Sequence, residues 1–94
     1  MSALHVHYSG QLALASSVTE ETIDIAEGAS TVQDVVARPA ERHGEAFKKL
    51  IYHEDGRIER TLFMALDGEQ VTDLAMPLTA AHQELMLMPP IAGG

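Results

Sequence analysis

The spacing of apolar residues changes along this chain of 94 residues, and that change constrains the fold more than any other feature. Near the start, Leu4, Val6 and Tyr8 occupy alternate positions, and Ile23 and Ile25 repeat the pattern. Alternating apolar and polar residues are typical of a strand with one buried face. We therefore expect two strands joined as an amphipathic hairpin.

The next stretch has the spacing of a helix. Val32, Val35 and Val36 fall on one helical face. Ser30 precedes them as the expected N-cap, and Gln33 stands three residues later, as in a capping box. The pattern predicts one main helix that begins at this cap.

Pro39 interrupts the helical pattern. Inside a helix, a proline removes one backbone hydrogen bond and costs about 3 kcal/mol. We therefore expect the first helix to stop or kink near Arg38. A second helical piece is expected from Pro39, with another break around Gly44.

The second half of the chain returns to strands. Two Asp-Gly pairs, at 55–56 and 67–68, are typical of hairpin turns because glycine accepts the positive φ that such turns need. The segment RTLFMAL lies between them, and ELMLM is the last predicted strand. One main helix packed on a mixed sheet of four to five strands is the economical arrangement, so we predict a two-layer α+β fold.

The last two predicted strands carry apolar residues on both faces. Phe63, Ala65, Met86 and Met88 occupy one face, and the other face is formed by Leu62, Met64, Leu66, Leu85 and Leu87. A sheet covered by one helix leaves its second face open, so these four residues would form an exposed apolar patch. Such patches mark partner surfaces, and methionine repacks easily against a partner. The alternatives are a loop folded over the patch or self-association of the chain.

Composition excludes several classes of site. The chain has no cysteine, which excludes disulfides, thiolate metal sites and cysteine nucleophiles. The absence of cysteine fits a cytoplasmic protein. We expect no signal peptide and no membrane span, because no basic segment precedes an apolar run and no apolar run approaches about 20 residues.

The formal net charge is −8. A surface of this charge repels nucleic acid and anionic lipid, so we expect neither as a partner. In one interpretation, the charge keeps the protein soluble. In the other, it forms an acidic face that docks on a basic partner.

Before its last six residues, the sequence offers no convincing active site. His5 and His7 have a spacing that can chelate zinc, but no third ligand is obvious, so we predict solvated histidines at the edge of the patch and no metal site. Adjacent acidic residues, such as those at 20–21 and 54–55, do not converge on one substrate atom. We expect these carboxylates to be solvated.

The chain ends on six residues that read PPIAGG. Gly93 and Gly94 lack a β-carbon and can pass through a channel too narrow for other residues. Pro89 and Pro90 shorten the mobile part and direct it away from the sheet. The pattern predicts a semi-rigid arm whose working group is the α-carboxylate of Gly94.

This ending resembles that of the MoaD/ThiS sulfur carriers, which are ubiquitin-like β-grasp proteins. The resemblance covers nearly the whole chain: STVQDVV is similar to the family's entry into its main helix, LFMALDGEQV to its strand–turn–strand, and MPLTAAHQELMLMPP to the lead into its last strand. Asp67 stands where Asn is usual, and Ala81-His82 replaces the usual Asp-Gly. The resemblance implies a β-grasp domain over residues 1–88 and a flexible tail over residues 89–94.

The resemblance implies a carrier, not an enzyme. A ubiquitin-activating-type adenylyltransferase would use ATP and magnesium to adenylate the Gly94 carboxylate, and a sulfur donor would convert it to a thiocarboxylate. The carrier itself would hold no cofactor, and Gly93 would provide clearance in the partner's channel. The apolar patch and the arm would bind the partners through Phe63, Met86, Met88, Pro89, Pro90, Ile91 and Ala92.

The acceptor implied is the large subunit of molybdopterin synthase, with this chain as the small subunit in molybdenum cofactor biosynthesis. A sulfur carrier for thiamine, cysteine or another metabolite is an alternative. A further alternative is a ubiquitin-like protein modifier conjugated to lysine through Gly94. In the plainest interpretation the chain is an interaction domain whose tail is incidental.

Overall fold

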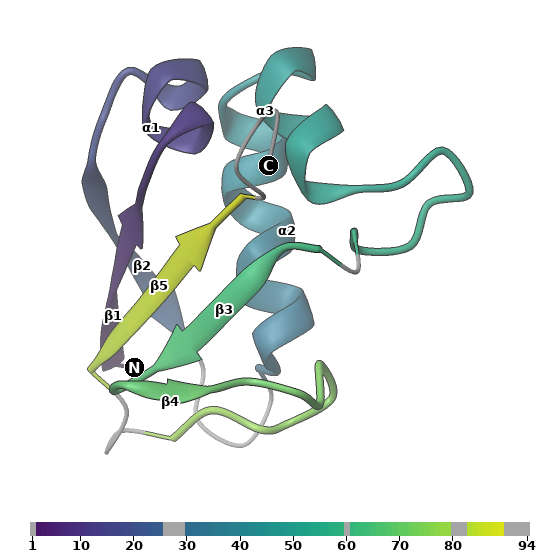
Figure 1. Cartoon of the computed structure of the whole chain (residues 1–94). Coiled ribbons are helices and arrows are strands. Elements are labelled where there is room, and N and C mark those ends of the chain that lie inside the picture. The colour runs from purple at the N-terminus through teal and green to yellow at the C-terminus, as the bar shows by residue number, and fades with distance from the viewer. Residues whose placement is uncertain (1, 26–29, 60, 80–82, 90–94) are drawn as a thin grey trace.

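The computed structural model describes residues 2–25, 30–59, 61–79 and 83–89 of the chain. These residues form a mixed sheet with helices packed on one side (Figure 1). In chain order the elements are β1 (Ser2–Tyr8), α1 (Gln11–Ser16), β2 (Glu20–Ile25), α2 (Val32–Arg42), α3 (Glu45–Ile51), β3 (Phe63–Leu66), β4 (Glu69–Gln70) and β5 (Glu84–Met88). The predicted α+β fold is confirmed.

The sheet has five strands in the order β2-β1-β5-β3-β4. β5 lies in the middle, parallel to β1 on one side and antiparallel to β3 on the other. The other pairs are antiparallel. β5 therefore pairs with a neighbouring strand on each side.

The predicted N-terminal hairpin is confirmed. β1 and β2 pair with Leu4 opposite Ile23, and both side chains are buried. The connection contains the short helix α1, which is entered through Gly10 at a φ of 57°. The alternation in the sequence thus correctly predicted which side chains of the two strands are buried.

The predicted cap of the main helix was wrong by one residue. Thr31 is the N-cap of α2, and its side chain accepts a hydrogen bond from the Asp34 backbone N–H at 3.2 Å. The Asp34 carboxylate accepts in return from the Thr31 N–H at 3.0 Å, which completes a capping box. Thr31 also forms a bridge with Pro77, so the neighbouring strand-like segment decides where the extended backbone ends and the helix begins.

The predicted break at Pro39 was also wrong, because α2 continues through it to Arg42. Pro39 is buried, as are Val35, Val36 and Ala40 on the same side of the helix. Burial against the core offsets the backbone hydrogen bond that proline cannot make. The break occurs instead at Gly44, whose φ of 88° suits glycine and starts α3.

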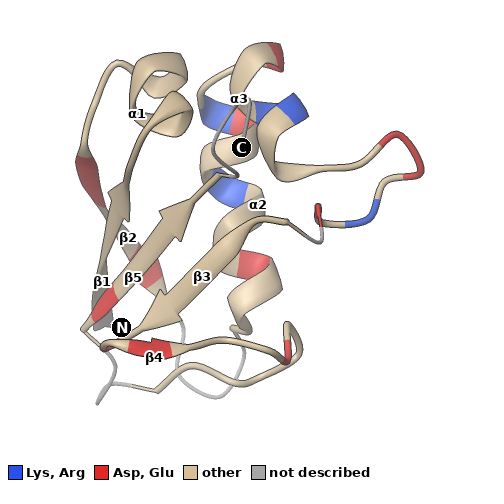
Figure 2. Cartoon of the chain, in the orientation of Figure 1, with Lys and Arg blue, Asp and Glu red and all other residues tan. Residues whose placement is uncertain are grey.

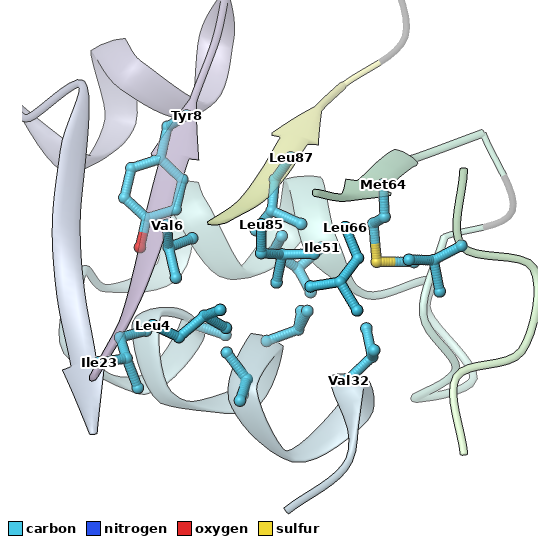
Figure 3. Close-up of a cluster of buried hydrophobic side chains, with 14 of the residues drawn as sticks. Leu4, Val6, Tyr8, Ile23, Val32, Ile51, Met64, Leu66, Leu85 and Leu87 are labelled. Carbon is cyan, nitrogen blue, oxygen red and sulfur yellow. The ribbon is translucent and has the colours of Figure 1, made fainter. Parts of the chain in front are cut away.

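The hydrophobic core fills the space between the sheet and the helices (Figure 3). Leucine and valine side chains of β1, β3 and β5 point from the sheet toward α2 (Figure 3). Phe47 and Ile51 of α3 and Leu78 of the later loop are fully buried and complete the core. The core is almost wholly aliphatic.

The predicted turn at Asp67-Gly68 is confirmed and has a second role. Both residues have a positive φ, 49° and 87°, as a tight hairpin between β3 and β4 requires. The Asp67 carboxylate also accepts hydrogen bonds from the backbone N–H groups of Gln83 and Glu84, at 3.1 and 2.9 Å. Asp67 therefore fixes the start of β5.

β5 ends at Met88, the last residue of the predicted domain. The division into residues 1–88 and 89–94 stays a prediction, because residues 90–94 lie outside the described part of the chain. Within the described residues, no helix is long and apolar enough to cross a membrane.

Candidate functional site

The face of the sheet opposite α2, which we call the open face, carries the predicted apolar patch. In Figure 1 the sheet lies in front of α2, and no described helix covers its near side. Phe63, Met86 and Met88 have exposed fractions of 40%, 42% and 39%, and Ala65 is half-buried. Their neighbours Met64, Leu85 and Leu87 are buried on the helix side. The predicted strand faces are therefore confirmed.

The strand register brings the patch together. Met86 of β5 lies between His7 of β1 and Ala65 of β3, and Phe63 lies opposite Met88. A hollow of about 390 Å³ opens among these side chains, lined by His7, Phe63, Ala65, Gly68, Glu84 and Met86. Residues from three strands thus form one apolar surface with a depression in it.

A polar cluster borders the patch. His7 stands opposite Glu20 in the register of β1 and β2. The Glu20 carboxylate lies 3.3 Å from His5 Nε2 through one oxygen and 3.3 Å from His7 Nδ1 through the other. The ligand atoms of the three side chains all lie within 4.8 Å of one another. The two histidines were noted in the sequence, but Glu20 was missed as their partner because only strand pairing places it there.

The end of β5 directs the chain toward the tail. The Ser9 N–H donates to the Leu87 carbonyl at 3.2 Å, and half-buried Pro89 follows. A β-carbon on Gly10 would lie 3.7 Å from Pro89 Cγ, so the turn after β1 packs beside the base of the arm. Pro89 thus directly follows Met88, the last exposed residue of the patch, and lies beside the turn at Gly10. Pro90, Ile91, Ala92, Gly93 and Gly94 lie outside the described residues.

Charge is distributed unevenly over the molecule (Figure 2). All six Lys and Arg residues of the chain lie between positions 38 and 60. In Figure 2 the cations gather on α2, on α3 and in the loop after α3, while the charged residues of β2, β4 and β5 are all acidic. On the open face, Glu20 and Glu84 stand beside the apolar patch. This face is therefore apolar at its centre and acidic at its edge.

A second titratable cluster lies on the helix side of the sheet. Glu21 accepts a hydrogen bond from Tyr8 Oη at 2.7 Å and contacts Arg42 and His43 of α2. Burial alone raises the pKa of Glu21, but the hydrogen bonds from His43 and Tyr8 and the charges of His43 and Arg42 together lower the pKa below its ordinary value. Burial and the bond to Glu21 raise the pKa of Tyr8. The cluster joins β1, β2 and α2 through contacts that all meet at the Glu21 carboxylate, as in a structural network.

A further hollow of about 710 Å³ lies between α3 and the following loop. Its lining includes Lys48 and Lys49 together with Glu45, Glu54 and Glu59. Exposed side chains of both signs are typical of a solvated surface, and we assign no site there.

Comparison with known proteins places the fold. No protein-family model matches the chain, and no curated protein matches it in sequence. Among solved structures, SAMP1 from Haloferax volcanii is 24% identical, with a TM-score of 0.86 over 99% of this chain and 100% of that one. A Pyrococcus furiosus protein assigned as molybdopterin converting factor, subunit 1, is 25% identical, with a TM-score of 0.73 over 97% and 100% of the two chains.

Urm1 from Trypanosoma brucei matches with a TM-score of 0.78 at 11% identity, over 99% of this chain and 96% of that one. These neighbours are ubiquitin-like proteins of the MoaD/ThiS type. The β-grasp fold expected from the sequence is therefore confirmed. Both chains of each pair are covered almost completely, so the similarity extends over the whole domain.

Proposed function

Because this chain has a ubiquitin-like β-grasp fold and ends on Gly-Gly, we propose that it is a sulfur carrier whose Gly94 carboxylate is the working group. The observation that supports this most directly is the position of β5. The central strand of the sheet ends at Met88, beside an exposed apolar face, and the sequence continues for six residues that read PPIAGG. A partner that binds the face would therefore have the tail within reach of its active site.

The proposed reaction starts at the α-carboxylate of Gly94. A carboxylate oxygen attacks the α-phosphate of ATP, which forms an acyl-adenylate and releases pyrophosphate. Sulfide from a donor then attacks the acyl carbon and displaces AMP, which leaves a thiocarboxylate. ATP and magnesium belong to the activating partner, and this chain acts as a non-catalytic co-substrate in the cytoplasm.

The tail suits such a transfer sterically. The five residues after Pro89 span at most about 18 Å when extended. Gly93 and Gly94 have no side chain to obstruct a narrow channel. Pro89 and Pro90 limit the conformations of the arm, which lowers the entropy lost when a partner binds it.

The open face would bind the partners. Its acidic edge favours a partner with basic groups around the contact, because complementary charge speeds and orients association. Its depression of about 390 Å³ accepts an apolar side chain next to Met86 and Phe63. The partner surface proposed includes Phe63, Met86, Met88 and Pro89, followed by the arm through Pro90, Ile91 and Ala92.

For the acceptor, we propose the large subunit of molybdopterin synthase, with this chain as the small subunit. The similarity to the Pyrococcus furiosus protein assigned as molybdopterin converting factor, subunit 1, favours this acceptor. Thiamine, cysteine and other sulfur pathways would use the same Gly94 chemistry with a different acceptor.

A second candidate function is protein modification. The similarity to two structures of small archaeal modifier protein 1 from Haloferax volcanii, with TM-scores of 0.86 and 0.83, favours it. In this case a lysine amine attacks the acyl-adenylate carbonyl of Gly94, loses a proton, displaces AMP and forms an amide. The two functions share activation and differ in the nucleophile that follows.

Mass spectrometry of the protein isolated from its own cells distinguishes these functions. A C-terminal peptide heavier by the difference between sulfur and oxygen supports the carrier, and Gly94 in branched lysine peptides supports the modifier. If neither form is present while the pathway is active, the chain is an interaction domain with an incidental tail. Removal of Gly93 and Gly94 should abolish both forms and change the free energy of unfolding by less than about 0.5 kcal/mol.

The docking face has its own test, Phe63→Asp. We expect this change to weaken binding to the adenylyltransferase of the same organism more than it lowers stability, because Phe63 is 40% exposed. Ala46→Asp is the matched control, since Ala46 is exposed on α3, away from the sheet. Unfolding by Phe63→Asp, or equal loss of binding in both variants, would contradict the assignment of the face.

A further inference from the structure

We propose that His5, His7 and Glu20 form a binding site for a divalent metal ion of the zinc class on the open face. The site does not use the tail, so zinc binding can be measured without any carrier activity, although His7 also lines the hollow of the apolar patch. Two strands supply it: β1 provides both histidines and β2 provides the carboxylate. The pairing of β1 with β2 sets Glu20 directly opposite His7, so the backbone of the sheet positions all three residues.

Two of the three distances between the ligand atoms fit a tetrahedral ion. With metal–ligand distances of about 2.0–2.1 Å, neighbouring ligand atoms of a tetrahedral zinc lie about 3.4 Å apart. The Glu20 oxygens lie 3.3 Å from His5 Nε2 and 3.3 Å from His7 Nδ1. Each oxygen faces one histidine, so an ion between the rings is held by both oxygens or by one of them after the carboxylate rotates.

The two imidazole rings lie close enough to share one ion after one of them turns about its Cβ–Cγ bond, which brings both ring planes onto the ion. They are stacked with centroids 5.0 Å apart and planes inclined by 17°. Residues two apart on a strand point to the same side, so this arrangement follows from the strand itself. Each ring presents a nitrogen to the same carboxylate, which leaves the mutual ligand distances within 4.8 Å.

The other nitrogen of His7 also has a partner of the right kind. His7 Nε2 lies 3.6 Å from a Glu84 oxygen on β5. Histidines that bind a metal through one nitrogen regularly direct the other toward a carboxylate, which fixes the ring and strengthens the ligand. Glu84 therefore positions His7 without being a ligand itself.

The donor set selects the class of metal. Two imidazoles and one carboxylate suit zinc and its neighbours among the transition metals, whereas magnesium and calcium prefer oxygen ligands alone. Three protein ligands leave a fourth position for water or for a group of another molecule. The cluster is part exposed, with side-chain exposed fractions of 45%, 31% and 52% for His5, His7 and Glu20, so that position is accessible.

Ion pairing between the histidines and Glu20 is the competing explanation for the cluster. Exposed pairs of this kind contribute little stability. If the histidines and Glu20 form only such pairs, the protein should have no affinity for metal. Titration of the full-length protein with zinc chloride, followed by calorimetry and by the NMR signals of the histidine rings, separates the two explanations. We expect one equivalent of zinc to bind and to shift the signals of His5 and His7.

Three variants test the ligands: His5→Gln, His7→Gln and Glu20→Gln. Each should weaken zinc binding about tenfold or more, since each removes one of three ligands. Their circular dichroism spectra should match that of the parent chain, because the three side chains lie outside the core. Glu84→Gln should weaken binding less than Glu20→Gln does, and the reverse order would contradict the assignment of Glu20 as the ligand.

His53→Gln is the matched control, because His53 forms a similar exposed pair with Asp55 at 3.5 Å but has no second histidine in that pair. This variant should bind zinc as the parent chain does. The proposal is overturned if the parent chain binds no zinc, if Glu20→Gln binds it undiminished, or if His53→Gln abolishes binding.

Discussion

Two neighbouring residues of β5 provide the sharpest test of the open face. Leu85 is fully buried on the helix side, and Met86 is 42% exposed on the opposite side. Both are changed to alanine, one at a time. Because the two positions share one strand and one set of backbone hydrogen bonds, the change in strand propensity is nearly the same for both.

The expected magnitudes differ because burial differs. Leu85→Ala leaves a cavity in the core and should lower the free energy of unfolding by about 2–5 kcal/mol. Full burial of a methionine side chain contributes about 1.5–3 kcal/mol, and Met86 has lost only part of its contact with water. Met86→Ala should therefore lower the free energy of unfolding by less than about 1.5 kcal/mol.

Urea unfolding followed by far-ultraviolet circular dichroism is the suitable assay, since the chain has no Trp to report by fluorescence. For a domain of this size, 1 kcal/mol corresponds to a shift in Tm of about 4–8 °C. Thermal unfolding should thus separate the two variants clearly. A cost for Met86→Ala as large as that for Leu85→Ala would mean that the open face is covered, and the docking proposal would lose its basis.

Three further predictions concern the fold. Thr31→Ala should lower the free energy of unfolding by about 1 kcal/mol, because it removes one half of the α2 capping box, and Thr31→Ser should retain most of it in the same urea assay. Gly68→Ala should cost about 1–2 kcal/mol, because the φ of Gly68 is 87°, and Gly68→Asn should cost less. Glu21 has a pKa below its ordinary 4.5, so its stabilising contribution is present above that pH and is lost as the pH falls through the lowered pKa. Acid titration of stability should accordingly be shallower in Glu21→Gln, and an unchanged acid profile would refute the role of its partners.

The local sequence pattern was sufficient to predict the structure wherever the environment of a residue follows from its immediate neighbours. The alternation in β1, β3 and β5 predicted which side chains are buried, because successive residues of a strand point to opposite faces. The two Asp-Gly turns were predictable for a similar reason, since the positive φ of a tight turn favours glycine. The chemistry proposed for the tail also comes from the sequence, because the absence of side chains at Gly93 and Gly94 is a property of the residues themselves.

The features that the sequence did not predict depend on contacts between distant segments. Thr31 is the cap of α2, which begins at Val32, because Thr31 pairs with Pro77 in an extended conformation, and Pro39 stays within α2 because it is buried with the core. Glu20 joins His5 and His7 only through the register of two strands, thirteen residues apart for His7. The sequence alone determined which residues alternate, turn and end the chain, whereas the tertiary structure decided which of them meet, because burial and strand pairing depend on segments that no local pattern connects.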